Sequence, residues 1–400
     1  MLNRLDLYEG LQTKSTYVPR PVAAGLTSLN IATLVPTAEA DRYDIGNVRK
    51  VGVIIIDGTV VRIKPKTPIR RLFAMLMYAR APEMLWRDDS VSFDSDADLY
   101  STIAHVFSLV TKTAIGGGLL RGYVVKDEAL PVVRGRWRTT DQLTRRAGHP
   151  LPLEVTYDDY VADIVENQII KAAALRLLRF PVLAPSVRSS LRQSLRLLDE
   201  VTTLPTGIRP PRVTVTRVNA RYQHAMVLAD LILSDRSLEH REGSVIGSGF
   251  LIGLWTVFED FVGNALGQAL HAHGGRATTQ YLSLLDSAGQ VTIEPDLVWA
   301  RDSAVDACID IKYKAERNGK YPNADLYQLI AYCTRFGLES GHLIYAAGDP
   351  IAGEINVVHG PTIYQHALRL DAAFPDILEQ VVELAAMISA PSLRSAATKE

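Results

Sequence analysis

Cysteine is scarce in this chain, which has two in 400 residues, Cys308 and Cys333. Both stand inside apolar segments, a setting typical of reduced thiols in the core of a cytosolic protein. The pattern predicts two free, buried cysteines rather than a disulfide or a zinc site.

Long apolar runs and an excess of charge are also missing. No run approaches the ~20 apolar residues that cross a bilayer, and residues 1–10 show no apolar segment of the secretory type. We therefore expect a cytoplasmic protein with no membrane contact. The net charge of −1, from 43 Lys and Arg against 44 Asp and Glu, excludes a general attraction to nucleic acid. Any DNA contact must then depend on a local basic patch.

A phosphate-binding loop is absent as well. The three glycines at 116–118 lack the following Lys-Ser/Thr, so we interpret them as a turn or hinge, and no other segment has the pattern. A system that needs nucleotide hydrolysis must obtain it from another chain.

The composition is that of an ordinary globular protein, with 47% hydrophobic and 22% charged residues. A chain of this length predicts two or three domains. We expect a multidomain α+β protein with a β-rich domain over 1–110, a basic and helical middle region over 111–240, and a third domain over 241–400.

The N-terminal domain shows a clear hairpin. Two β-branched strands at 51–56 and 59–64 flank Asp57-Gly58, a pair that favours the type I′ turn. An amphipathic helix is predicted at 68–79. This domain serves either as a docking module or as a small domain that packs on the rest, and the pattern favours neither.

The clearest chemical pattern lies in two adjoining strands predicted at 291–299 and 307–314. The first carries a Pro-Asp ending at Asp296, and Asp310 opens an Asp-Ile-Lys fourteen positions later. Side chains alternate across a strand, so Asp310, Lys312 and Lys314 share one face. A hairpin would place the Asp296 carboxylate beside that of Asp310.

Two adjacent carboxylates repel unless a cation lies between them, so this pair suits Mg²⁺, with Mn²⁺ as the alternative. The Ile311 carbonyl is a further candidate ligand. Lys312 would orient or deprotonate a water, or neutralise charge that develops on a phosphate. The other interpretation is a surface hairpin with an ordinary Asp–Lys pair, which contributes little energy.

Two helices supply further polar side chains. A predicted helix at 325–332 carries Gln328, and one at 253–262 carries Glu259 as a third carboxylate. With a strand at 342–347, the order helix, hairpin, helix, strand is that of the restriction-endonuclease-like α/β core. We expect this core in the C-terminal domain, with Glu259 as a metal ligand and Gln328 bonded to the ligands or the attacking water.

The motifs, in this order, resemble the McrC family, the cleavage subunits of McrBC modification-dependent restriction systems. The resemblance covers about residues 50–347. The matching segments are Ile63–Lys66, Met75–Ala79, Leu119–Tyr123, Val133–Trp137, Glu166–Ala173, Arg217–Tyr222, Phe258-Glu259, Pro295-Asp296, Asp310–Lys314 and Asp325–Gln328.

The resemblance implies a Mg²⁺-dependent DNA endonuclease of the PD-(D/E)xK class, acting in defence against DNA with modified cytosine. Its active site would consist of Asp296, Asp310, Lys312, Glu259 and Gln328. It also implies assembly with a hexameric AAA+ GTPase motor, whose GTP hydrolysis the chain stimulates and which the N-terminal part contacts. Two alternatives stay open: a nuclease of another ATPase-driven defence or repair complex, and a non-cleaving scaffold that activates a motor.

Residues 111–150 form the most basic stretch, with eight Lys and Arg against three acidic residues. It is a candidate for contact with the backbone of double-stranded DNA through Arg134, Arg136 and Arg138, together with Lys314. A solvated basic face explains the pattern equally well.

Overall fold

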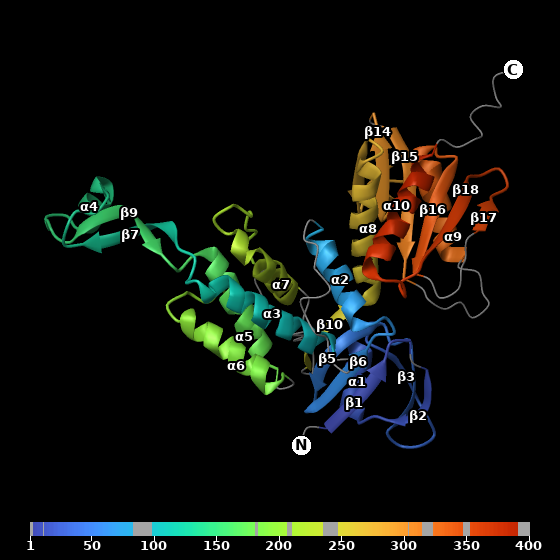
Figure 1. Ribbon diagram of the computed structural model, residues 1–400, viewed down its shortest axis with the longest axis horizontal. Helices are drawn as coiled ribbons and strands as arrows, with labels where there is room; N and C mark the ends of the chain where they lie inside the picture. The colour runs from blue at the N-terminus through green and yellow to red at the C-terminus, as the bar shows by residue number, and fades with distance from the viewer. Residues whose placement is uncertain are drawn as a thin grey trace. The chain divides into compact units, whose positions relative to one another are not determined.

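The computed structural model describes residues 3–10, 12–82, 98–180, 183–205, 210–234, 247–302, 304–313, 323–346 and 353–390 (Figure 1). It divides into two compact units. One combines Met1–Leu99 with Ser237–Glu400, and the other is Tyr100–Arg236. Several sheets and many helices confirm the expected mixture of α and β structure. The boundaries at 110 and 240 stay predictions. Among the helices described, none combines the length and apolar character that crossing a membrane requires.

The N-terminal part of the first unit is built on a four-stranded sheet with the order β1-β6-β5-β10. The predicted hairpin is confirmed: β5 and β6 pair antiparallel, and Asp57 and Gly58 have positive φ angles of 47° and 71°. The strands of the sheet are β1 (Asn3–Tyr8), β5 (Lys50–Ile56), β6 (Thr59–Lys64) and β10 (Gly247–Gly253).

Strand β10 joins this sheet from far along the chain. It lies antiparallel to β5, opposite Gly52, whose φ is +134°. A Cβ on Gly52 would lie 2.1 Å from the carbonyl oxygen of Phe250, so only glycine permits this approach. The sequence does not predict β10 because three glycines interrupt the apolar pattern of its seven residues.

A smaller three-stranded sheet with the order β2-β4-β3 and two helices complete this part. Leu26 and Val22 of α1 pack in one core with Ile54 of β5. Helix α2 matches the prediction within two residues and buries Leu72, Phe73 and Met77. The elements are α1 (Arg20–Ser28), β2 (Thr13–Tyr17), β3 (Thr33–Pro36), β4 (Arg42–Gly46) and α2 (Ile69–Arg80).

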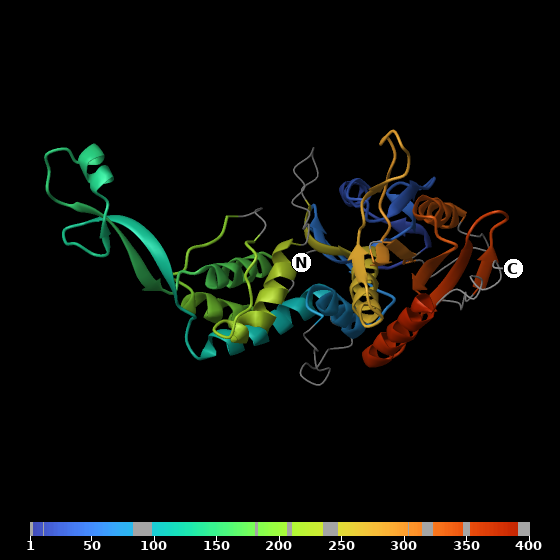
Figure 2. The ribbon, with the colours of Figure 1, turned by 90° about the horizontal axis from the view of Figure 1, so that it is seen from above.

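The C-terminal part of this unit is a six-stranded sheet with the order β11-β14-β15-β16-β18-β17. Helix α9 packs on β15 and β16 through a core that includes Leu329, Cys333 and Leu343. Figure 2 shows α9 and α10 on opposite sides of the sheet. The elements are β11 (Arg276–Thr279), β14 (Leu297–Arg301), β15 (Ala304–Lys312), β16 (Ser340–Ala346), β17 (Gly353–Asn356), β18 (Thr362–Leu368), α8 (Leu254–His271), α9 (Asn323–Phe336) and α10 (Phe374–Ser389).

The β14–β15 hairpin differs in extent from the two predicted strands. Its turn lies at Asp302, which has a φ of +48°, and β15 begins three residues before the predicted start. The first half of the predicted 291–299 strand instead forms β13 (Thr292–Ile293), which pairs with β12 (Ser283–Leu284). Pro295 separates β13 from β14 because it has no N–H with which to continue a ladder. Both cysteines are free and buried, as predicted.

The second unit is a helical body from which a β ribbon extends (Figure 1). The body contains the helices expected in this region, and the side-chain amide of Asn167, fully buried, donates to the carbonyls of Leu120 and Ala162 at the base of the ribbon. Its helices are α3 (Leu99–Gly116), α5 (Val165–Leu178), α6 (Pro185–Leu197), α7 (Gln223–Ser234) and the 3-10 turn η2 (Ala220–Tyr222).

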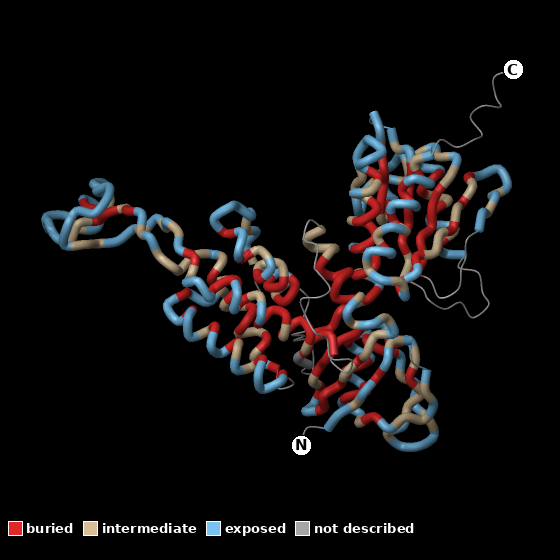
Figure 3. Tube along the Cα trace, viewed as in Figure 1, coloured by how far each residue is buried: buried red, intermediate tan, exposed pale blue. Residues whose placement is uncertain are grey.

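The middle region, expected to be basic and helical, also contains this β ribbon. Strands β7 (Gly122–Leu130) and β9 (Leu153–Val161) pair antiparallel over nine positions, and β8 (Arg136–Trp137) and α4 (Thr139–Arg145) lie between them in the chain. Strand β7 follows the alternation expected of a β-strand, because exposed and half-buried residues alternate along most of its length. Figure 3 shows that the ribbon is mostly exposed, whereas buried residues gather in the helical body.

Candidate active site

Three predicted site residues meet where β14 begins and β15 ends. The ammonium of Lys312 lies 2.9 Å and 2.8 Å from the two carboxylate oxygens of Asp310, and 3.6 Å from Oδ2 of Asp296. Asp310 is fully buried, whereas Lys312 keeps 22% of its side chain exposed. Alternation along β15 places Asp310 and Lys312 on one face, so the strand itself produces this contact.

The Asp296 side chain is fixed by the backbone of the neighbouring strand. The N–H of Ile311 donates to Oδ2 of Asp296 at 2.6 Å. On the other side, the N–H groups of Gln280 and Tyr281 donate to the carbonyls of Asp296 and Pro295. The carboxylate is therefore held at the start of β14 and faces Lys312.

Helix α8 brings Glu259 to the same place. Burial, together with the charge of Asp296 and a hydrogen bond to it, raises the pKa of Glu259 to about 8. Burial and the charge of Asp296 likewise raise the pKa of Asp310 to about 7, although Lys312 opposes this. Both shifts indicate that too little positive charge surrounds Glu259 and Asp310 to stabilise their ionised forms.

Lys312 cannot supply that charge alone. Burial lowers its pKa, but the charges of Asp310 and Asp296 outweigh that effect and the pKa is raised. The side chain is thus an ammonium at neutral pH. One positive charge faces the three carboxylates of Glu259, Asp296 and Asp310, which explains why the pKa values of Glu259 and Asp310 are raised.

Helix α9 borders the cluster with a different residue from the one predicted. Gln328 is exposed, and its amide donates to the Tyr332 hydroxyl at 2.6 Å, with no contact to the carboxylates among the described interactions. Asp325, one turn earlier on α9, is buried, and its charge contributes to the raised pKa of Lys312. Asp325, Gln328 and Tyr332 lie at i, i+3 and i+7 on one stripe of the helix, and this spacing is the sequence pattern that points to Asp325 as well as to Gln328.

The donor set fits a divalent cation. Carboxylate oxygens are the ligands that Mg²⁺ prefers, and Oδ2 of Asp310 is buried with no hydrogen bond, although Lys312 pairs with it. Within the described residues, no group of three or more His, Cys, Asp or Glu side chains already has the arrangement of a metal site. Lys312 lies between Asp296 and Asp310, so a cation would require its ammonium to shift. The role of the Ile311 carbonyl stays a prediction.

The arginines proposed for DNA contact lie on the ribbon of the second unit. Arg134 pairs with Asp159 and stacks on Tyr157, and Arg138 pairs with Asp127 and with a second carboxylate on α4. Within the part of the chain that the structure describes, Arg136 forms no ion pair. DNA contact by these arginines stays a prediction, and Lys314 lies outside the described residues.

The basic stretch is balanced by acids that the sequence places elsewhere. Strand β9 brings Glu154 to Arg146 and Asp159 to Lys126 and Arg134. The excess of positive charge in 111–150 is therefore smaller on the folded ribbon than in the sequence.

Comparisons with known proteins identify the family of this chain. The family model described as McrBC 5-methylcytosine restriction system component matches residues 47–346. The chain belongs to the McrBC family. No curated protein matches the chain.

Two solved McrBC structures are similar to this chain, and both come from Thermococcus gammatolerans. One is a half-complex from a tetradecameric assembly of McrB AAA+ hexamers with bound McrC; the match has a TM-score of 0.62 at 17% identity and covers 96% of this chain and 100% of that one. The other is a cryo-EM structure of the McrBC complex, with a TM-score of 0.45 at 19% identity, covering 67% and 88%. The first shows that the fold is shared along nearly the whole chain.

Proposed function

We propose that this McrBC family member is the nuclease subunit of a restriction complex directed at modified cytosine. It hydrolyses DNA phosphodiesters with Mg²⁺ at a restriction-endonuclease-like core formed by α8, the β14–β15 hairpin, α9 and β16. The observation that carries the proposal is the cluster of Glu259, Asp296 and Asp310 around a single ammonium. Buried clustered carboxylates are unfavourable for folding, and a bound cation would compensate for them.

Each residue has a distinct role in this proposal. Asp296 and Asp310 hold the cation, Glu259 completes its shell, and the Ile311 carbonyl is a further candidate ligand. The metal would polarise the scissile phosphate and lower the pKa of a nearby water. Lys312 is charged at neutral pH, so its role is to neutralise charge on the phosphate and orient the attacking water rather than to remove a proton.

The role of α9 follows from its contacts. Gln328 donates to the Tyr332 hydroxyl, which in turn lies 3.5 Å from the carbonyl of Glu294, two residues before Asp296. Through Tyr332, Gln328 therefore helps to position the segment that carries Asp296, without itself contacting a ligand. Asp325, also on α9, contributes to the raised pKa of Lys312 through its negative charge.

The partner in this proposal is a McrB-like AAA+ GTPase. Support comes from the family match and from the fold shared with a chain of an assembly of McrB AAA+ hexamers with bound McrC. The chain has no phosphate-binding loop of its own, so a separate motor would supply nucleotide hydrolysis. We propose that the N-terminal domain, with its β1-β6-β5-β10 sheet, contacts that motor and stimulates it.

Cleavage of methylated and unmethylated plasmid tests the proposal. Wild type, Asp310→Asn and the control Asp302→Asn are compared with Mg²⁺, a McrB-like motor subunit and GTP. Asp302 lies at the far end of the same hairpin with a positive φ that asparagine accepts, so the control should cut normally.

We expect Asp310→Asn to lose cutting while it still assembles with the motor and accelerates GTP hydrolysis. If Asp310→Asn cuts as wild type does, the assigned site is wrong. If wild type never cuts but accelerates the motor, the chain is a scaffold. Cutting that requires ATP instead of GTP would identify a different class of motor.

A further inference from the structure

Tyr313 directly follows Lys312, the last residue of β15, and turns to the other face of the sheet. Side chains alternate across a strand, so Lys312 faces Asp310 while Tyr313 faces α8. The Tyr313 ring packs on that of Phe258, with the ring centroids 5.7 Å apart and the planes at 56°. Phe258 directly precedes Glu259 in α8. This half-buried tyrosine is therefore a neighbour of both Lys312 and the turn that carries Glu259.

The hydroxyl of Tyr313 reaches the N-terminal part of the same unit. It donates a hydrogen bond to the carboxylate of Glu9 and accepts one from the hydroxyl of Thr67. Burial and the charge of Glu9 raise the pKa of Tyr313, so the phenol keeps its proton and remains a donor. Glu9 follows β1, and Thr67 lies between β6 and α2. The end of β15 is thus bonded to two connecting segments of the N-terminal part.

Glu9 is itself fixed by the backbone of the strand beside it. Its N–H donates to the carbonyl of Lys64 at 2.8 Å, and its Oε2 accepts from the N–H of Lys66 at 3.0 Å. These two bonds join the end of β1 to the end of β6. Glu9 therefore offers the Tyr313 hydroxyl an acceptor whose position is set by the N-terminal sheet.

Helix α8 begins in that same sheet. Gly253 is both the last residue of β10 and the N-cap of α8, so the helix continues directly from a strand paired with β5. Glu259 lies about one and a half turns into the helix. The N-terminal sheet therefore reaches Glu259 through the chain, and it reaches Lys312 through the hydroxyl of Tyr313.

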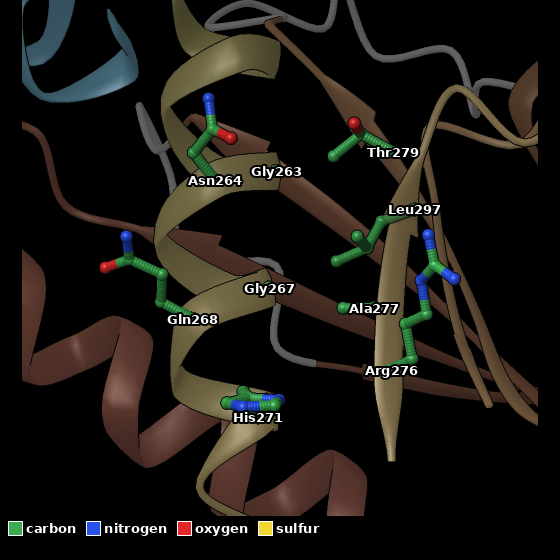
Figure 4. Close-up of a pocket in the computed structure, with 9 residues that line it drawn as sticks. All are labelled: Gly263, Asn264, Gly267, Gln268, His271, Arg276, Ala277, Thr279 and Leu297. Atoms are coloured by element: carbon green, nitrogen blue, oxygen red, sulfur yellow. The ribbon is translucent and has the colours of Figure 1, made fainter. Parts of the chain in front are cut away.

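The second half of α8 is held by contacts that do not involve Tyr313. The helix lies directly on β11, because a Cβ at Gly263 would be only 3.2 Å from Cγ2 of Thr279 (Figure 4). On another side of the helix, the Tyr78 hydroxyl of α2 donates to Oε1 of Gln268 at 3.0 Å. Figure 4 shows Gln268 on the side of α8 turned away from β11. These contacts lie about one to three turns beyond Glu259, so they fix the far half of the helix.

We propose that Tyr313 is a positioning residue for the candidate site. Its hydroxyl, bonded to Glu9, holds the end of β15 so that Lys312 stays against its carboxylates. Its ring holds the turn of α8 that presents Glu259. The inference rests on the proposed nuclease function, and it makes the geometry of the site depend on the N-terminal part of the chain.

Plasmid cutting with Mg²⁺, a McrB-like motor subunit and GTP tests this with two changes that each remove one hydroxyl. Tyr313→Phe loses the bond to Glu9 and keeps the ring against Phe258. Tyr78→Phe is the matched control, because it loses a hydrogen bond between α2 and the far half of α8. We expect Tyr313→Phe to lower the maximal cutting rate about tenfold at an unchanged KM for DNA, and Tyr78→Phe to cut as wild type does.

A double-mutant cycle assigns the effect to the hydrogen bond. Glu9→Ala removes the acceptor, whereas Glu9→Gln keeps an oxygen in its place. We expect Glu9→Ala to lower cutting about as much as Tyr313→Phe, and the double variant to lose no more than either single variant. Glu9→Gln should retain most of the activity.

Amide hydrogen exchange of the full-length chain in EDTA gives a readout that needs neither metal nor motor. We expect Tyr313→Phe to speed exchange in peptides that cover 307–313 and 254–262, because both segments lose a fixed neighbour. Exchange in β16 should be unchanged. Tyr78→Phe should leave the peptide over 307–313 at the wild-type rate.

Wild-type cutting or wild-type exchange in Tyr313→Phe, an equal loss of cutting in Tyr78→Phe, or additive losses in the double variant would overturn the inference. Failure of the nuclease assignment has a different signature, since Asp310→Asn would then cut as wild type does. The exchange measurement would in that case still report whether Tyr313 fixes the end of β15. If Asp310→Asn is inactive and Tyr313→Phe is fully active, the positioning role alone is refuted.

Discussion

Replacing Asp310 with asparagine should stabilise the protein at alkaline pH while abolishing metal binding. Asp310 is fully buried, and its pKa of about 7 in the folded chain compares with 3.8 as the ordinary value. That raised pKa already includes the attraction of Lys312, so the ionised carboxylate is unfavourable on balance. At about 1.4 kcal/mol per pKa unit, the ionised form lowers the free energy of unfolding by at most ~4.5 kcal/mol.

The pH window follows from the sign of the shift. Below pH 4 the carboxyl is protonated in both the folded and the unfolded chain, so it has no effect there. Between about pH 4 and pH 7 the folded chain binds the proton more tightly, so wild-type stability falls as the pH rises, and above pH 7 the full penalty is present. Asparagine carries no charge and removes this decline.

Urea unfolding followed by tryptophan fluorescence measures the effect at pH 5 and pH 8 in EDTA. Trp299 reports on the sheet directly, because it is buried in β14 and its indole N–H donates to the carbonyl of Gly274. We expect Asp310→Asn to exceed wild type by a few kcal/mol at pH 8 and by much less at pH 5. Added Mg²⁺ should stabilise wild type alone. A variant less stable than wild type at pH 8 would refute the reasoning.

Three further predictions concern other positions. Gln328→Ala frees the Tyr332 hydroxyl at an exposed site, so plasmid cutting should fall about tenfold with little change in melting temperature. Asn167→Ala leaves one buried and one partly buried carbonyl without their donor and should lower the free energy of unfolding of the second unit by about 2–4 kcal/mol in urea titrations. Gly341→Ala places a Cβ 2.5 Å from Sγ of Cys333 and should destabilise by about 1–3 kcal/mol, and a thermal melt equal to wild type would contradict this.

Local sequence patterns predicted the elements whose partners lie nearby in the chain. Asp57-Gly58 indicated the β5–β6 turn because the positive φ angles of a type I′ turn demand such residues. The alternation of side chains placed Asp310 and Lys312 on one face, and the structure shows their contact. These features follow from rules that act over a few residues.

Features that depend on distant pairing were not predictable in the same way. Strand β10 is defined by its fit against Gly52, about two hundred positions earlier, and its own glycine-rich sequence carries little strand signal. The ion pairs of the ribbon also depend on distant pairing, because Asp159 reaches Arg134 only when β7 and β9 align. A count of charges along the chain therefore overstates the basic character of this surface.

The candidate site combines both situations. The order of Asp296, Asp310 and Lys312 in the sequence pointed to the cluster, but helical spacing alone could not decide which residue of α9 would face it. The structure places buried Asp325 near Lys312 and leaves Gln328 exposed against Tyr332. An acidic residue can be buried where a positive charge lies nearby, and the position of Lys312 relative to α9 is set by the packing of the helix on the sheet.

Calorimetry of Mg²⁺ binding at pH 7 tests most directly whether the carboxylates around Lys312 form a metal site. The pKa of Glu259 is about 8 and that of Asp310 about 7, so at pH 7 the pair is partly protonated and a cation must displace protons from it. Titration in buffers of different ionisation enthalpy should show release of about one proton or more per site in wild type, and no binding in Asp310→Asn. Binding without proton release, or equal binding by the variant, would contradict the assignment.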